Sequence, residues 1–166
     1  MALGMAATIR IGFRIGTGEA VEARTTAIIT VVLTLLFALA GALLIVLFRA
    51  QMVALYTSEP VVSQLSMTLL LFVVFFLAFD ALQSTVTGCL RGYKDTRVPM
   101  GIAMFSYWVI GLPLECVLGF GLVGEPMGVY GFWLGLAVGI GIAAMLLLSR
   151  LWFVSRNPAR RAQGRV

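Results

Sequence analysis

Four long apolar runs constrain this chain more than any other feature of its sequence. They occupy residues 25–48, 65–90, 98–120 and 128–152. A helix needs about 20 mostly apolar residues to cross the hydrocarbon core of a bilayer, and each run is long enough. Only 11% of the residues are charged, whereas a soluble domain usually carries about 25%. We therefore expect an all-α, polytopic membrane helical bundle with four complete spans.

The segment before the first complete span is apolar but short. Residues 1–15 include Arg10 and Arg14, and we interpret them as the end of a truncated transmembrane helix. A secretory signal is the alternative, but its basic residues would precede the apolar stretch rather than follow it. The predicted organisation is then a cytoplasmic loop at 16–24, a four-helix transmembrane region at 25–153 and a basic cytoplasmic tail at 154–166.

Basic residues are distributed unevenly between the two sides of the predicted spans. Of the 12 Lys and Arg residues, all except Arg49 fall on one side. Loops rich in Lys and Arg remain in the cytoplasm, so this side is predicted to be cytoplasmic, together with the C-terminus. The tail arginines suit contact with anionic lipid, although a topology signal explains them equally. The asymmetry accounts for the net charge of +5 without a nucleic-acid partner.

Several classes of chemistry are excluded by composition. The chain has no His, and its two cysteines, Cys89 and Cys116, lie in apolar runs without CxxC spacing. Imidazole bases, Ser-His or Cys-His nucleophile systems and a zinc site therefore have no residues to support them. The remaining candidate catalytic groups are isolated acids without a base or nucleophile partner. We expect neither an enzyme nor a cofactor, and we interpret both cysteines as small buried hydrophobes.

Asp80 is the acid most deeply placed within an apolar run. A bilayer penalises such a residue by about 2.5–3.5 kcal/mol, so it marks a functional hypothesis by default. Asp80, Gln83, Ser84 and Thr87 follow i, i+3, i+4, i+7 spacing and form one polar stripe along a helix. The stripe should line a water-accessible cavity or contact another helix. A carboxylate there suits protons, Na⁺ or cationic organic groups; the alternative is a protonated structural acid.

Glu115 is the second acid within an apolar run. Pro113 lies two residues before it and frees a backbone carbonyl, which makes the Gly111 to Pro113 region a predicted hinge. Glu115 lies nearer the outer end of its span than Asp80 does, so contact with interfacial water is an equal alternative to a role in the pore. Tyr107 lies on a comparable face and suits either packing or an organic cation.

Two further patterns indicate close helix packing. Small or hydroxylated residues recur along one stripe of the first span, and glycines recur at intervals of four in the last. These residues are Thr26, Thr30, Thr34, Ala38 and Gly41, followed by Gly131, Gly135 and Gly139.

Several short motifs follow one another in a fixed order. They are Thr8-Ile9-Arg10-Ile11-Gly12, Phe79-Asp80-Ala81-Leu82-Gln83, Gly92-Tyr93-Lys94-Asp95-Thr96-Arg97-Val98-Pro99 and Gly128-Val129-Tyr130-Gly131-Phe132-Trp133. Their order and spacing resemble the C-terminal half of a MATE (multidrug and toxic compound extrusion) family transporter of the NorM type. The resemblance covers nearly the whole chain.

The resemblance implies a fold and a mechanism. MATE transporters have twelve helices in two six-helix lobes, and they exchange Na⁺ or H⁺ for organic cations by alternating access. The chain would run from the eighth to the twelfth helix, and Asp80 occupies the position of a cation-coupling acid in the tenth. Na⁺ is then the only metal expected, at Asp80. The implied partners are membrane lipid, small cationic organic substrates and the missing N-terminal lobe of the same protein.

The sequence departs from the family pattern at Glu115. Relatives commonly have Gly in this position, so the resemblance assigns Glu115 no role. We expect a fragment of a cation-coupled multidrug efflux antiporter in a bacterial inner membrane, unable to transport by itself. One alternative is a lipid-linked oligosaccharide flippase of the same superfamily, although such proteins need basic residues in the cavity. The other is an inactive truncated membrane protein.

Overall fold

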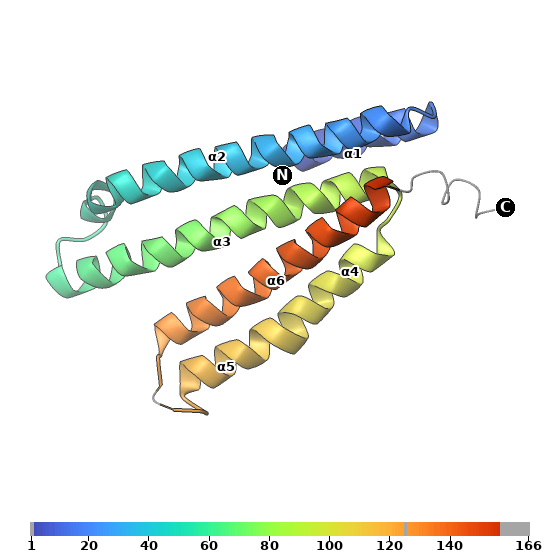
Figure 1. The fold of residues 1–166 in the computed structure, drawn as a ribbon. Helices are drawn as coiled ribbons and strands as arrows, with labels where there is room; N and C mark the ends of the chain where they lie inside the picture. The colour runs from blue at the N-terminus through green and yellow to red at the C-terminus, as the bar shows by residue number, and fades with distance from the viewer. Residues whose placement is uncertain (1, 125, 157–166) are drawn as a thin grey trace.

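A computed structural model describes residues 2–124 and 126–156, and this part of the chain consists of helices and turns without a strand (Figure 1). The predicted all-α fold is confirmed. The elements in chain order are α1 (Ala2–Gly16), α2 (Ala20–Ala54), α3 (Pro60–Gly92), α4 (Arg97–Met104), the π-helix η1 (Phe105–Gly111), α5 (Leu112–Phe120) and α6 (Val129–Arg156).

Four helical stretches are long and apolar enough to cross a membrane: α2, α3, α4 through α5, and α6. They correspond to the four predicted spans. The observed helices are longer than the predicted apolar runs. Helix α2, for example, has 35 residues and is about 52 Å long, whereas the hydrocarbon core of a bilayer is roughly 30 Å thick. Helix geometry thus continues past the apolar run, through Glu22 at one end and Arg49 at the other.

The connection between α1 and α2 is shorter than the loop predicted at 16–24. The first helix ends at Gly16, the next begins at Ala20, and Gly18 turns the chain with a φ of 82°. Glu22 favours helix here, because a negative charge in the first turn is stabilised by the helix dipole. At the C-terminal side, α6 continues to Arg156. The rest of the predicted tail, 157–166, lies outside the described residues.

The buried core lies at one end of the bundle, which we call the basic end. Here the C-terminal ends of α1, α3 and α6 meet the N-terminal end of α2 (Figure 1). Many of its buried side chains are small, which lets the helices approach closely. The core includes Ala7, Ile11, Ala23, Ala27, Leu82, Val86, Cys89, Leu90, Tyr93, Ala144, Leu147, Leu151 and Val154.

Helices α1 and α3 cross without an intervening side chain. A Cβ atom on Gly88 would overlap the Gly4 carbonyl group, and one on Gly4 would lie 3.0 Å from the Ser84 carbonyl oxygen. The Thr8 hydroxyl lies 2.8 Å from the Gly88 carbonyl oxygen and donates to it, across the same crossing. Glycine is required on both helices because the two backbones are in contact.

Helices α3 and α6 separate toward the other end, which we call the open end. There α3 and α6 are held apart by aromatic pairs, Phe72 with Tyr130 at 6.1 Å and Phe76 with Trp133 at 6.3 Å between ring centroids. The two helices diverge in Figure 1 as they leave the basic end. At the basic end the same two helices bury smaller side chains, among them Val86, Cys89 and Ala144.

The last span packs against α5 through the predicted glycines. A Cβ on Gly131 would lie 2.5 Å from the Leu118 carbonyl carbon, and one on Gly139 would lie 3.0 Å from the Gly111 Cα. The close-packing prediction is confirmed for this stripe. In α2 it holds for Thr34, whose hydroxyl lies 2.9 Å from that of Thr85. It is wrong for Gly41, because no described atom beyond its own stretch of helix lies within 4 Å of the Cβ position there.

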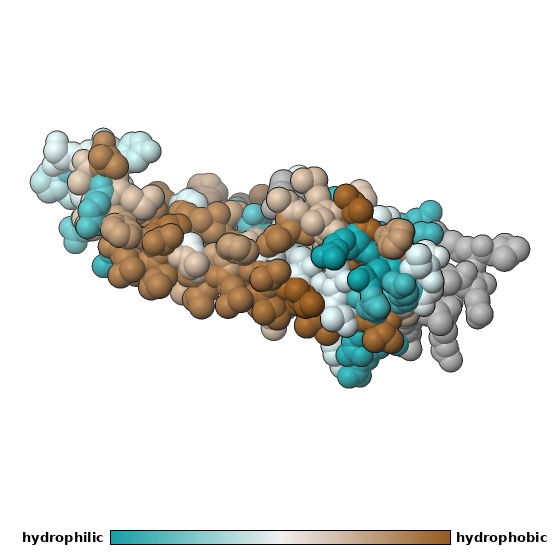
Figure 2. Space-filling model, turned by 90° about the horizontal axis from the view of Figure 1, so that it is seen from above, coloured by the Kyte–Doolittle hydropathy of each residue, from teal (hydrophilic) through white to brown (hydrophobic). Residues whose placement is uncertain are grey.

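The outer surface is apolar over most of its length. Figure 2 shows hydrophobic residues along the middle of one face and hydrophilic residues toward its two ends. Large hydrophobic side chains of α2 remain exposed, among them Leu36 at 58% and Phe37 at 67%. A surface of this kind is suited to lipid or to apolar helices rather than to water.

Candidate functional site

Asp80 lies where the packed and the separated parts of the bundle meet. It precedes the end of α3 at Gly92 by 12 residues, which is about 18 Å along the helix. The buried core on α3 begins only two residues later, at Leu82. The Asp80 side chain is exposed. The acid therefore lies next to the end of the buried core, on the side of α3 that faces α1 and α2.

A groove of about 410 Å³ contains Asp80 and lies between α1, α2 and α3. Asp80 and Ser84 are on its α3 wall, Thr34 and Phe37 are on α2, and Leu3 closes it from α1. The groove thus combines one carboxylate and several hydroxyl groups with a mainly apolar lining. Such a combination is suited to a small cation or to an organic cation with an apolar body.

Asp80 makes no hydrogen bond or ion pair with the other described residues. Within the described ranges, no three His, Cys, Asp or Glu residues gather into a metal-binding group. Na⁺ bound at Asp80 would therefore complete its coordination with hydroxyl groups, backbone carbonyls or water. A proton would need the carboxylate alone.

The predicted polar stripe is divided between two neighbours. Ser84 faces the groove with Asp80, whereas Gln83 accepts a hydrogen bond of 2.7 Å from the Tyr107 hydroxyl on η1. Thr87 is half-buried and lies one turn closer to the basic end. The tertiary structure thus brings Gln83 and Tyr107 together and places Asp80 and Ser84 on a different face. The predicted roles of these residues in transport stay predictions.

The predicted hinge coincides with a change in helix type. Residues Phe105–Gly111 form a π-helix, and the N–H group of Leu112 donates to the carbonyl of Tyr107, five residues earlier. Pro113 follows and has no N–H group to donate, so the wider turn lies where the α-helical bonding would be interrupted. Gly111 is buried against Gly139 of α6. The hinge function itself stays a prediction.

Glu115 lies apart from the Asp80 groove. Its backbone nitrogen and its Cγ atom both approach Gly135 of α6, within 2.7 Å of the position that a Cβ would take. The side chain is half-buried. Glu115 thus belongs to the α5–α6 contact, and its predicted place among pore-lining residues stays a prediction.

The sequence reasoning missed an ion pair at the basic end. Asp95, only 6% exposed, accepts a hydrogen bond of 2.8 Å from the Arg150 Nε atom. The pair joins the α3–α4 connection to α6 across 55 residues of sequence. From the sequence, Arg150 was interpreted only as one of the basic residues that set the topology, and Asp95 only as part of a motif. An acid in a basic loop beside an apolar run was the signal that could have indicated it.

Tyr93 lies beside this ion pair in the sequence and is also buried, with 8% of its surface exposed. Burial raises the pKa of Tyr93 to about 12, and the positive charge of Arg24 opposes the increase. The Tyr93 hydroxyl makes no hydrogen bond within the described part of the chain.

Comparisons with known proteins identify the family of this chain. The profile of the family described as MatE matches residues 1–117, which is more than half of the chain. The chain belongs to the MatE family. It is 43% identical over 150 residues to the multidrug resistance protein PmpM of Pseudomonas aeruginosa. It is 37% identical over 161 residues to the multidrug resistance protein NorM of Aliivibrio fischeri.

These matches cover 90% and 96% of the chain, but only 31% and 35% of the two relatives. The chain thus spans about a third of the length of these MatE proteins. A solved structure, that of the eukaryotic MATE transporter AtDTX14, superimposes with a TM-score of 0.81. It covers 96% of the chain at 24% identity, with 36% of its own length matched, and supports the fold alone.

Proposed function

We propose that this chain forms part of the C-terminal lobe of a multidrug efflux transporter in a bacterial inner membrane. The transporter exchanges Na⁺ or H⁺ for organic cations by alternating access, and the basic end faces the cytoplasm. The proposal is supported by the MatE relatives, which are named as multidrug resistance proteins in bacteria. The distribution of basic residues supports the orientation.

The observation that carries the mechanism is the environment of Asp80. Its carboxylate is exposed to a groove and has no ion-pair partner among the described residues. An acid locked to a fixed cation could not exchange ligands, whereas this one is available to bind them in turn. Cation and drug then compete for one negative charge, so binding of one favours release of the other.

The residues around Asp80 have supporting roles in this proposal. Ser84 provides a hydroxyl oxygen for the coupling cation, while Phe37 provides an aromatic surface for an organic one. On the neighbouring face, Gln83 and Tyr107 join α3 to η1 by their hydrogen bond. A movement at the Gly111 to Pro113 region would therefore be transmitted to the helix that carries Asp80.

The decisive test is the substitution Asp80→Asn in the transporter that contains this chain. Dye efflux from cells and cation-driven uptake into inverted vesicles should both fall to background, while membrane insertion is unchanged. Glu59→Gln is the matched control, because it removes an acid from the loop before α3 and should leave efflux intact. Efflux at the wild-type rate from the Asp80→Asn variant would contradict the mechanism. Loss of lipid-linked sugar export with normal dye efflux would support the flippase instead.

A further inference from the structure

A second groove lies near the basic end, between α1 and α2, and has a volume of about 380 Å³. Its lining changes in character along its length. Arg10, Arg14, Glu22 and the hydroxyls of Thr25 and Thr26 lie at one end, whereas Leu3, Ile29 and Leu33 lie at the other. The groove therefore has a polar part with two arginines and one acid nearer the basic end, and an apolar part deeper in the bundle.

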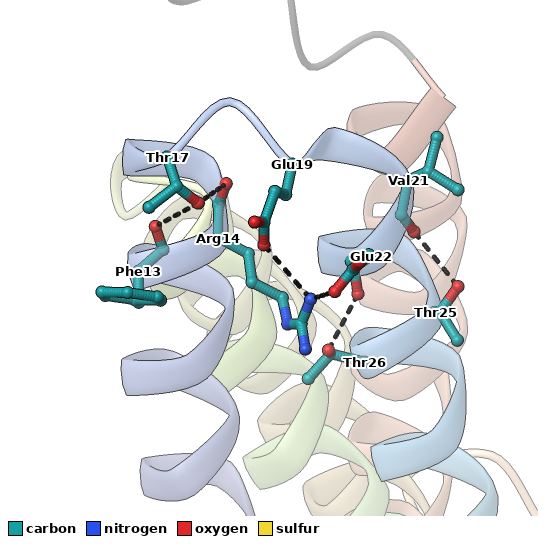
Figure 3. A network of polar contacts seen from close by, with 8 residues as sticks. All are labelled: Phe13, Arg14, Thr17, Glu19, Val21, Glu22, Thr25 and Thr26. Carbon is teal, nitrogen blue, oxygen red and sulfur yellow. Dashed lines mark hydrogen bonds and ion pairs between the residues drawn. The ribbon is translucent and has the colours of Figure 1, made fainter.

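The two arginines differ in how their charges are compensated. Arg14 forms ion pairs with Glu19, at 3.3 Å, and with Glu22 (Figure 3). Arg10 lies one turn deeper on the same helix and is exposed. It has no hydrogen bond or ion pair with any residue between 2 and 156 that the structure describes. The groove therefore contains one uncompensated guanidinium group.

The depth of Arg10 makes this charge informative. It precedes the end of α1 at Gly16 by six residues, which is about 9 Å along the helix axis. A guanidinium at this depth is costly in lipid unless it reaches the interface or meets an anion. Glu22 of the groove and the neighbouring Glu19 are already paired with Arg14. An anion that compensates Arg10 would then come from outside the described residues.

We propose that this groove binds an anionic phospholipid, with the phosphate on Arg10 and an acyl chain along Leu3, Ile29 and Leu33. A guanidinium can donate two parallel hydrogen bonds to one phosphate, which favours Arg over Lys at such a site. The Thr25 and Thr26 hydroxyls now donate to carbonyls of their own helix, at 3.1 and 2.8 Å. They can be redirected toward the headgroup. The apolar part of the groove distinguishes a lipid from a free phosphate ion.

Native mass spectrometry of the purified protein in detergent tests the proposal, with phosphatidylglycerol and phosphatidylcholine as competing probes. The wild-type protein should retain phosphatidylglycerol with a preference of about tenfold, the value expected for one charged hydrogen-bonded contact. Arg10→Gln should lose the preference, and Arg10→Lys should retain part of it. Arg97→Gln is the matched control, because it removes an exposed basic residue at the start of α4 and should retain the full preference.

Three outcomes would overturn the proposal. The first is equal retention of the two lipids by the wild-type protein. The second is an equal reduction in Arg10→Gln and Arg97→Gln, because it would indicate diffuse charge attraction. The third is displacement of bound lipid by millimolar inorganic phosphate, because it would indicate a phosphate site. If Arg10→Gln fails to fold, the graded response of Arg10→Lys against Arg97→Gln still decides the question.

Discussion

The basic end and the open end of this bundle are built from the same kinds of helix but packed in different ways. At the basic end, small residues such as Ala23, Cys89 and Ala144 are fully buried, and Gly88 brings two backbones into contact. At the open end, Phe72 and Phe76 contact aromatic rings of α6, with more than 6 Å between the ring centroids. The difference teaches that side-chain size determines where the helices close and where they separate.

Asp80 lies at the end of the packed region of α3, on the side that faces α1 and α2. Apolar helices gain little from one another in lipid, so their contacts depend on close packing and hydrogen bonds. Small residues and the Thr34–Thr85 contact provide these up to the level of Leu82. Asp80 lies just beyond, where packing ends and a groove begins. An acid at the limit of a rigid region can bind ligands without disturbing the core.

The largest expected effect is at the Asp95–Arg150 ion pair. Asp95→Ala should lower the free energy of unfolding by about 3–5 kcal/mol, because it leaves the charge of Arg150 without its partner. Denaturation in detergent measures the change. Arg14→Gln should cost under about 1 kcal/mol, because its ion pairs are more exposed. The double substitution Asp95→Ala/Arg150→Ala should recover part of the loss. Equal losses for Asp95→Ala and Arg14→Gln would refute the comparison.

A smaller effect separates two glycines, one at the α1–α3 crossing and one toward the open end. Gly88→Ala should lower the free energy of unfolding by about 1–3 kcal/mol, because the new Cβ overlaps the Gly4 carbonyl group. Gly41→Ala has open space around its Cβ and should be neutral or stabilising by up to about 1 kcal/mol. Thermal denaturation of the two variants side by side checks this. The difference in packing would be disproved if Gly41→Ala proved the more harmful.

The smallest effect is a pH dependence at the basic end. Below pH 10, Tyr93 is neutral in the folded and unfolded states and does not affect the pH dependence of stability. As pH rises from 10 to about 12, the unfolded state loses the proton first, because burial raises the pKa of Tyr93 in the folded state. Stability should therefore fall across this window. Tyr93→Phe should remove that part of the decline and should remain as stable as wild type at neutral pH.

Absorbance of the tyrosinate ion provides a direct measurement. The wild-type protein should show one late titration step near pH 12 that is missing in Tyr93→Phe. A step near pH 10 at this residue would mean that water reaches the basic end.

The helices and the family could be predicted from the sequence because both depend on local patterns. The apolar runs predicted the four spans. The motifs around Asp80 and Asp95 indicated a resemblance to the family, and the MatE match confirms it. The glycine stripe of α6 was predicted from its spacing alone. Gly41 ends a similar stripe of small residues in α2, three residues after Ala38, but has open space at its Cβ position, so the pattern was correct only where a partner helix is present.

The sequence by itself determined that the chain is a bundle of membrane-length helices with its positive charge on one side, because hydrophobic length and charge are properties of segments. Only the tertiary structure decided which charges and hydroxyls meet. It paired Asp95 with Arg150, turned Gln83 toward Tyr107 and left Asp80 facing a groove. These contacts depend on how close two helices approach, and that distance is set by side chains far apart in the sequence.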